Sequence, residues 1–164
     1  HNQFQNVEGH RKVLIGPGEY DIQGVSVIGV SSFHDDVKGE QRGKNTIFVF
    51  ESEDITIAHL GDLGHDLSEK QLAAIGEVNV LMVPVGGIYT IDPQKASDVV
   101  RSIDPNVIIP MHFKQQGMSK DFDSLADLDQ FINLTGIRVE KTKKFSLKKV
   151  DIIEDDQRIV VFEN

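Results

Sequence analysis

The chain has 164 residues, which is enough for one domain with a hydrophobic core, and its formal net charge is -9. This acidic balance disfavours nucleic acid as a partner, because binding a phosphate backbone takes a cluster of lysines and arginines. The absence of cysteine excludes disulfides, cysteine nucleophiles and cysteine-ligated zinc, so a metal would have to be held by His, Asp or Glu. No apolar run approaches the roughly 20 residues of a membrane span and no signal peptide is evident, so we expect a cytoplasmic protein without membrane association.

The first half of the chain alternates short apolar runs with polar turns. These runs predict strands over residues 13–16, 25–33, 46–50 and 55–59. The polar segment 51–54 indicates that the last two strands form a hairpin. Ser68 and Gln71 have the spacing of a capping box, which predicts a short helix ending at Gly76. The nearly continuous apolar run 78–85 is typical of a central strand that is buried on both faces.

The second half places helices between strands. Asp92 as N-cap and Pro93 at the first helical position predict a helix to about residue 103. A strand follows over 107–111, and we expect Pro110 at a sheet edge or near the strand end because proline has no N–H to donate. The remaining predicted elements are a helix over about 124–134 and strands over 137–140 and 158–162. The basic run 141–149 is interpreted as the solvated face of a strand or hairpin.

This order of elements predicts a single α/β layered domain over residues 1–164, built on a mixed sheet. In open α/β sheets, ligands bind at the carboxyl ends of the strands. Three potential metal ligands lie just beyond the ends of predicted strands, namely His34, Asp62 and His112. A lone histidine at a strand end is more often structural. Three such groups together indicate a site for zinc or a similar divalent ion, since strand ends hold ligands in fixed geometry.

The segment around Asp62 carries the densest signal. Glycines on both sides allow a sharp backbone turn, and the carboxylate has two oxygens that can bridge two metal ions. His59 and His65 flank this aspartate. Each is either a contact to a ligand or substrate or a structural residue, His59 in the core and His65 in an exposed loop.

Two glycine-containing loops have open interpretations. The polar loop 39–45, with Lys38, Arg42 and Lys44, either contacts a phosphate or carboxylate or is simply solvated. The segment 86–90 either brings backbone N–H groups or Tyr89 towards a substrate anion or is a flexible turn. The sequence contains no P-loop and no G-x-S-x-G nucleophile elbow, so covalent catalysis by serine has no support.

Five short motifs occur in order along the chain. They are Ser31-Ser32-Phe33-His34-Asp35, Arg42-Gly43-Lys44-Asn45-Thr46, His59-Leu60-Gly61-Asp62, Val83-Pro84-Val85-Gly86-Gly87 and Ile109-Pro110-Met111-His112-Phe113. Their order and spacing resemble the metallo-β-lactamase superfamily, in particular its branch of Zn-dependent hydrolases. The resemblance covers the chain from its first residue to about Phe113. It implies an αββα sandwich with metals in a cleft at one edge.

The resemblance also implies residue roles. His34 corresponds to a ligand of the first metal, Asp62 to the bridging aspartate and His112 to a ligand of the second metal. The leading His-x-His-x-Asp-His motif of the family is missing from this chain. We interpret His1 as its last histidine, which would join Asp62 and His112 in the second metal site; the alternative is a terminal residue without a role. The sandwich would then be incomplete at its N-terminus, and its bare apolar sheet would be covered by the missing N-terminal part or by another chain.

The function expected from these residues is that of a metal-dependent hydrolase. A metal-bound hydroxide would attack a small-molecule ester, lactone or phosphodiester, with Asp62 as the catalytic residue that orients the hydroxide. One or two zinc ions are the expected cofactor, with manganese or iron as alternatives because the ligand set lacks sulfur. Two other readings stay open: a non-catalytic, partner-binding module of the same fold, and an enzyme assembled from two polypeptides.

Overall fold

A computed structural model describes residues 7–10, 12–153 and 156–163. Eight strands form a single sheet in the order β1-β2-β3-β4-β5-β6-β8-β7. In chain order the strands are β1 (Gly18–Ile22), β2 (Val25–Phe33), β3 (Lys44–Ser52), β4 (Ile55–His59), β5 (Val80–Pro84), β6 (Val107–Met111), β7 (Val139–Thr142) and β8 (Arg158–Phe162). The helices are α1 (Glu69–Ile75), α2 (Pro93–Ile103) and α3 (Leu128–Thr135), and short 3-10 turns occupy Lys120–Phe122 and Lys149–Asp151.

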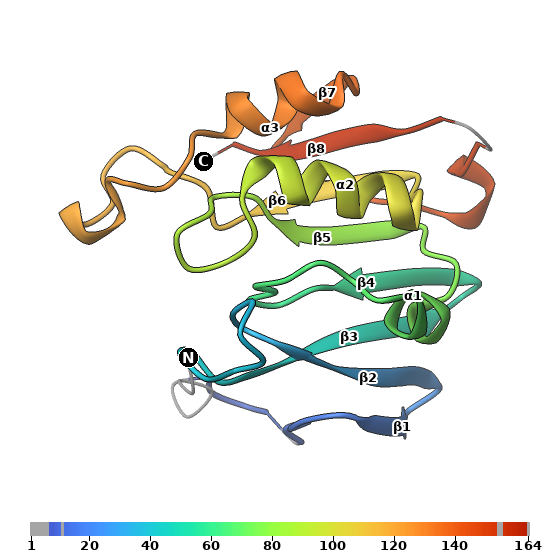
Figure 1. Ribbon diagram of the computed structural model, residues 1–164. Coiled ribbons are helices and arrows are strands. Elements are labelled where there is room, and N and C mark those ends of the chain that lie inside the picture. The colour runs from blue at the N-terminus through green and yellow to red at the C-terminus, as the bar shows by residue number, and fades with distance from the viewer. Residues whose placement is uncertain (1–6, 11, 154–155, 164) are drawn as a thin grey trace.

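The sheet has an antiparallel half and a parallel half. Strands β1 to β4 form an antiparallel meander, whereas β4, β5, β6, β8 and β7 pair in parallel. Parallel neighbours need crossover connections, and α1 and α2 lie in two of them. Because β2 runs in the same direction as β4, β5 and β6, the carboxyl ends of these four strands meet at one edge of the sheet (Figure 1).

All three helices of the described residues cover the same face of the sheet (Figure 1). The core on this face consists of sheet residues and at least one buried side chain from each helix. The sheet contributes Ile47, Ala58, Leu81, Val83, Ile108 and Ile159, and the helices contribute Ile75, Val99, Val100 and Phe131. Burying these apolar side chains is the main stabilising term for the layer.

The opposite face of the sheet is covered only in part by described residues. Over the parallel half, Val80, Val107 and Val160 are buried beneath Phe145 and Leu147 of the segment after β7. Over the antiparallel half, Phe48 and Phe50 are half-buried. The described residues thus supply one sheet and one helical layer, and the predicted α/β class with a mixed sheet is confirmed.

Most elements lie where the sequence predicts them. The β3–β4 hairpin is confirmed, and β5 lies in the middle of the sheet as expected. Helix α1 has the predicted capping box, and α2 begins behind the Asp92 cap. Pro110 lies near the end of β6, where β6 no longer pairs with β8, so its missing N–H leaves no gap in that ladder.

Three boundary predictions are wrong. Residues 13–16 form no strand; β1 lies at Gly18–Ile22 instead, where polar Glu19 and Asp21 alternate with Tyr20 and Ile22 in the two-residue period of a strand. The last helix begins at Leu128 rather than near residue 124 because the backbone before it bonds elsewhere: the Ala126 N–H donates to the Gly86 carbonyl at 2.8 Å, and the Ala126 carbonyl accepts the Lys114 N–H at 2.9 Å. The lysines of the basic run are exposed, as predicted, but the run leaves β7 after Thr142 and forms no hairpin, since Phe145 and Leu147 turn inward to pack on the sheet.

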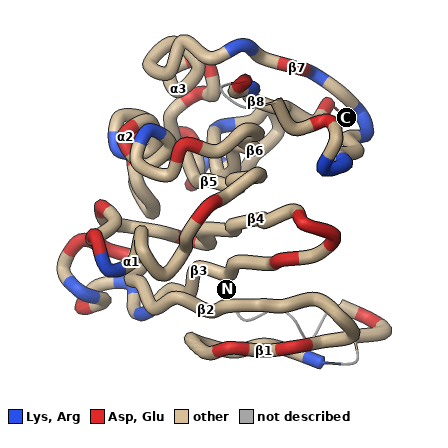
Figure 2. Tube along the Cα trace, turned by 90° about the vertical axis from the view of Figure 1, so that its right-hand side faces the viewer, with Lys and Arg blue, Asp and Glu red and all other residues tan. Residues whose placement is uncertain are grey.

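The charges are spread unevenly over the molecule. Figure 2 shows acidic residues on β1 and around the β3–β4 turn, and lysines and arginines around β7 and the C-terminal end. Among the described helices, none has the length and apolar character required to cross a membrane. The cytoplasmic location and the single domain over residues 1–164 stay predictions from the sequence.

Candidate metal centre

Three of the predicted ligands meet at the carboxyl edge of the sheet. His34 directly follows β2, Asp62 lies three residues beyond β4, and His112 directly follows β6. All three line one pocket of about 520 Å³, which we call the metal pocket. His112 Nδ1 lies 3.4 Å from Asp62 Oδ1, and His34 is 7% exposed. The fourth predicted ligand, His1, lies outside the described residues.

His34 is fixed by the backbone on both sides. Its N–H donates to the Gly43 carbonyl at 3.0 Å, and the preceding Phe33 carbonyl accepts from the Gly64 N–H at 3.0 Å. Gly64 packs so closely that a Cβ there would overlap the His34 carbonyl group. Burial lowers the pKa of His34, and the charge of Arg42 adds to this, while the carboxylate of Asp62 acts in the opposite direction. The ring is therefore favoured in the neutral form, which is the form that binds metals.

His65 supports the same strand end. Its Nε2 accepts the N–H of Phe33 at 3.1 Å, and its Nδ1 lies 2.8 Å from the Asp66 carbonyl. The first bond requires an unprotonated Nε2, so Nδ1 carries the proton and donates to that carbonyl. His65 is half-buried and acts on His34 through the backbone of Phe33.

Asn45 positions Asp62. Its Oδ1 accepts the Asp62 N–H at 3.0 Å, and its Nδ2 donates to Ser32 Oγ and to the Leu60 carbonyl, both at 2.8 Å. One amide therefore ties β2, β3 and the turn after β4 together. The sequence analysis did not predict this role. The feature that indicates it is a polar residue, Asn45, directly before the apolar run of β3 and inside one of the five motifs.

His59 also acts on the turn that carries Asp62. Its Nδ1 accepts the Gly61 N–H at 3.0 Å. Burial lowers the pKa of His59, and the nearby His112 adds to this effect. Of the two interpretations open from the sequence, the structure places His59 in a partly buried, hydrogen-bonded position next to the site.

His112 is held by backbone geometry rather than by a network of side chains. Its φ of 56° is left-handed, a conformation that residues other than glycine adopt rarely. Gly86 permits this arrangement, because a Cβ at that position would overlap the His112 carbonyl oxygen. Backbone strain of this kind persists where the surrounding structure enforces it and is concentrated at functional sites.

Asp35 organises the loop that follows His34. Its buried carboxylate accepts the N–H groups of Val37, Gly39, Gln41 and Arg42 at 2.6 to 3.1 Å. Burial on its own would raise the pKa of Asp35, but the four backbone donors outweigh it and hold the pKa below its usual value. The carboxylate therefore stays charged and fixes where the loop carries Arg42.

The metal pocket has a polar floor and an apolar wall. The wall consists of Met118, Phe122 and Leu125, all from the segment between β6 and α3. Tyr89 stands beside this wall, edge-on to the Phe122 ring at 6.2 Å, and its hydroxyl donates to the Asp121 carbonyl at 3.3 Å. Such a pocket can receive an apolar group while the polar floor contacts the reacting atoms.

The donor atoms of the metal pocket suit a divalent metal. Two imidazoles and a carboxylate are ligands that zinc accepts, and they also accommodate manganese or iron. Within the described part of the chain, however, no three His, Asp or Glu side chains are grouped closely enough to form a metal site by themselves. His34, Asp62 and His112 therefore fit a divalent metal ion as part of its ligand set.

Comparisons with known proteins identify the family to which the chain belongs. Residues 1–112 match the family model described as a β-lactamase superfamily domain. A UPF0173 metal-dependent hydrolase from Methanopyrus kandleri is 29% identical over 68% of this chain and 50% of its own length. One from Thermoplasma acidophilum is 30% identical over 79% of this chain and 56% of its own length. The chain thus spans little more than half of these two relatives.

Solved structures align with nearly the whole chain. A protein from Thermotoga maritima, described as a candidate Zn-dependent hydrolase of the metallo-β-lactamase superfamily, aligns with a TM-score of 0.78 and 38% identity. That alignment covers 99% of this chain and 77% of the Thermotoga chain. A metallo-hydrolase from Ignicoccus hospitalis, at 16% identity and a TM-score of 0.60 over 91% of this chain and 56% of its own, shares the fold. The chain therefore belongs to the metallo-β-lactamase superfamily, and its relatives are named metal-dependent hydrolases.

Proposed function

We propose that this protein is a metal-dependent hydrolase that acts on an ester, lactone or phosphodiester of a small molecule. One observation carries the proposal: His34, Asp62 and His112 leave three different strands and open into one pocket with an apolar wall. Substrate would lie between this wall and the polar floor. The names of the relatives support a metal and a hydrolytic reaction, and the substrate class is our inference.

The three donors would hold the metal, which we propose to be zinc. A zinc ion supplies Lewis acidity and lowers the pKa of a bound water towards about 7. Asp62 also has a second task, because a carboxylate beside the attacking water can accept its hydrogen bond and orient it. Met118, Phe122 and Leu125 would exclude bulk water from the reacting group, which strengthens the electrostatic interactions at the polar floor.

We infer that further donors complete the centre from outside the described residues. The described ligand set is partial, and the chain spans little more than half of the two curated relatives compared above. The half-buried Phe48 and Phe50 on the uncovered face of the sheet would suit such a second layer. The layer would be an N-terminal part of the same protein or another chain.

The experiment is a hydrolysis assay with three probes, an aryl ester, a γ-lactone and bis(4-nitrophenyl) phosphate, in the presence of zinc. We expect turnover of at least one probe and a loss of about 100-fold or more in kcat/KM for Asp62→Asn. Asp66→Asn is the matched control, since it changes an exposed aspartate four residues away whose side chain makes no hydrogen bond to described residues. Equal losses in both variants, or none in Asp62→Asn, would contradict the assignment.

A second candidate is a non-catalytic binding module of the same fold. The partial ligand set within the described residues favours it. The two functions separate in the same assay: a module would bind zinc weakly or not at all and turn over none of the three probes, with or without a protein that supplies the leading motif.

A further inference from the structure

A second pocket adjoins the metal pocket and differs from it in character. It measures about 180 Å³ and is lined by polar and charged groups, including Arg42, Lys95, Asp36 and Asp92; we call it the polar pocket. His34, Tyr89 and Thr90 line both pockets, so the two share a boundary at the candidate metal centre.

Tyr89 forms the partition between the two pockets. The Arg42 guanidinium lies over its ring, 5.8 Å from the ring centroid, while Phe122 contacts the ring from the metal pocket. The residue before it, Ile88, has a φ of 61° although it is β-branched and 54% exposed. A left-handed isoleucine at the surface is costly, so the fold maintains a strained backbone to place Tyr89 here.

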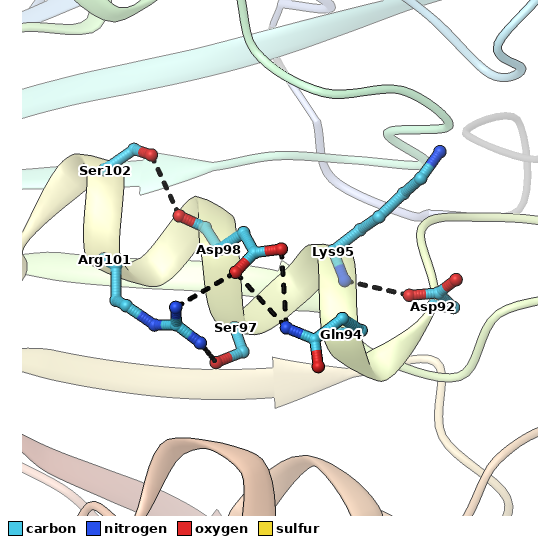
Figure 3. A network of polar contacts seen from close by, with 7 residues as sticks. All are labelled: Asp92, Gln94, Lys95, Ser97, Asp98, Arg101 and Ser102. Carbon is cyan, nitrogen blue, oxygen red and sulfur yellow. Dashed lines mark hydrogen bonds and ion pairs between the residues drawn. The ribbon is translucent and has the colours of Figure 1, made fainter.

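The two cations of the polar pocket form no ion pair with described residues. Neither Arg42 nor Lys95 has a side-chain hydrogen bond or ion pair within the described part of the chain. Figure 3 shows the Lys95 side chain extending away from α2, outside the polar network that joins Gln94, Asp98 and Arg101. The two cations therefore remain available to an incoming anion.

Two of the carboxylates that line the polar pocket accept hydrogen bonds from backbone N–H groups. Asp35 accepts four backbone N–H groups, and Asp92 caps α2 by accepting the Lys95 N–H at 2.8 Å. Both keep their charge but are held in place by these bonds, and Asp36, which is exposed, is the one carboxylate of the lining whose side chain makes no hydrogen bond to described residues. At the boundary of the two pockets, Thr90 Oγ1 is buried and makes no hydrogen bond to any residue that the structure describes. A buried hydroxyl without a partner is a ready donor for an anion.

We propose that the polar pocket binds an anionic group of the substrate, a carboxylate or a phosphate monoester, through Arg42, Lys95 and the Thr90 hydroxyl. The proposal rests on the proposed hydrolase function and narrows its substrate class. The substrate would have two unlike ends: an apolar group against Met118, Phe122 and Leu125, and an anionic group beside Tyr89, with the scissile bond between them at the metal pocket. A guanidinium suits both anions because it offers paired N–H donors.

Anion binding is tested first without catalysis. The 15N-labelled chain is titrated with monomethyl succinate and with methyl phosphate, and neutral dimethyl succinate serves as the reference. We expect saturable shifts of the Thr90 amide and the Arg42 Nε signals with at least one anion and none with the diester. The anion with the lower Kd identifies the group, and Arg42→Ala should weaken its binding about tenfold or more. Shifts that persist in Arg42→Ala, or that the neutral diester reproduces, would overturn the proposal.

The second test measures ester hydrolysis. The ratio of kcat/KM for mono(4-nitrophenyl) succinate to that for 4-nitrophenyl butyrate should fall about tenfold or more in Arg42→Ala. Lys44→Ala, an exposed cation of the same segment outside both pockets, should leave the ratio unchanged. An unchanged ratio in Arg42→Ala would overturn the subsite. If the wild-type chain turns over neither ester, the proposed hydrolase function fails, while the titration still decides whether the anion site exists.

Discussion

The antiparallel and parallel halves of the sheet hold their parts of the candidate site in different ways. In the antiparallel half, side chains add to the positioning by the backbone: Asn45 fixes the Asp62 backbone, and His65 fixes the strand end before His34, on which Gly64 also packs closely. In the parallel half, His112 is held by a left-handed backbone packed against Gly86, and its Nδ1 lies 3.4 Å from Asp62 Oδ1. The positions of Asp62 and His34 should therefore depend on side-chain hydrogen bonds in addition to close packing at Gly64, whereas the position of His112 should depend on close backbone packing at Gly86.

The difference follows from where each strand ends. Strand β3 lies between β2 and β4, so one amide at its beginning reaches the ends of both neighbours. The backbones beyond β5 and β6 stay in direct contact, and the Val85 N–H donates to the Met111 carbonyl at 2.9 Å. The next residues, Gly86 and His112, lie so close together that a side chain at position 86 would overlap the His112 carbonyl oxygen. The predictions below test this contrast in order of decreasing effect.

Replacing Gly86 with Ala should have the largest effect. The new Cβ would overlap the His112 carbonyl oxygen, and neither backbone can move freely. We expect a loss of about 3 kcal/mol in the free energy of unfolding and a displaced His112, measured by urea denaturation and zinc titration. Gly117→Ala is the control, since its Cβ would meet open space although its φ is 87°. If both variants lose the same stability, the close approach at Gly86 is not what matters.

Asn45→Ala should come next. It removes hydrogen bonds to the Asp62 N–H, to Ser32 and to the Leu60 carbonyl, so zinc affinity should fall about 10- to 100-fold. Isothermal titration measures the change. Asn133→Ala, at an exposed position on α3, should leave the affinity unchanged. An Asn45→Ala chain that binds zinc as tightly as the wild type would remove the contrast between the two halves.

His65→Ala should have a smaller effect, because it acts on His34 only through the Phe33 N–H. We expect a loss of about tenfold in zinc affinity. His65→Gln should recover most of it, because an amide oxygen can accept the same N–H. If the Gln variant binds no better than the Ala variant, the role of the imidazole goes beyond this hydrogen bond.

Ile88→Gly should have the smallest effect, with the opposite sign. Glycine adopts a φ of 61° without steric cost, so the free energy of unfolding should rise by up to about 1 kcal/mol. Ile153→Gly changes an exposed isoleucine whose φ is not positive and should show no gain. Thermal denaturation of both variants measures the difference. A destabilised Ile88→Gly chain would mean that the isoleucine side chain has a packing role.

The sequence predicted which strand-end residues gather, but not what holds them. His34, Asp62 and His112 were predictable because ligand chemistry and strand ends are both local features of the sequence. The φ of His112, the approach of Gly86 and the stacking of Arg42 on Tyr89 depend on loops that meet only in the folded chain. The misplaced first strand has a similar cause, since pairing of Gly18 with Gly29 and of Ile22 with Val25, rather than the apolar run before it, decides where β1 forms.

The central claim is that His34, Asp62 and His112 bind a divalent metal. The most direct test is elemental analysis after equilibration with zinc and gel filtration, carried out on the chain together with the part that supplies the remaining donors, beside Asp62→Ala and the control Asp66→Ala in the same assembly. We predict one to two zinc equivalents in the wild type and the control, and a loss of most of that metal in Asp62→Ala. Equal metal content in all three chains, or none in any of them, would contradict the claim.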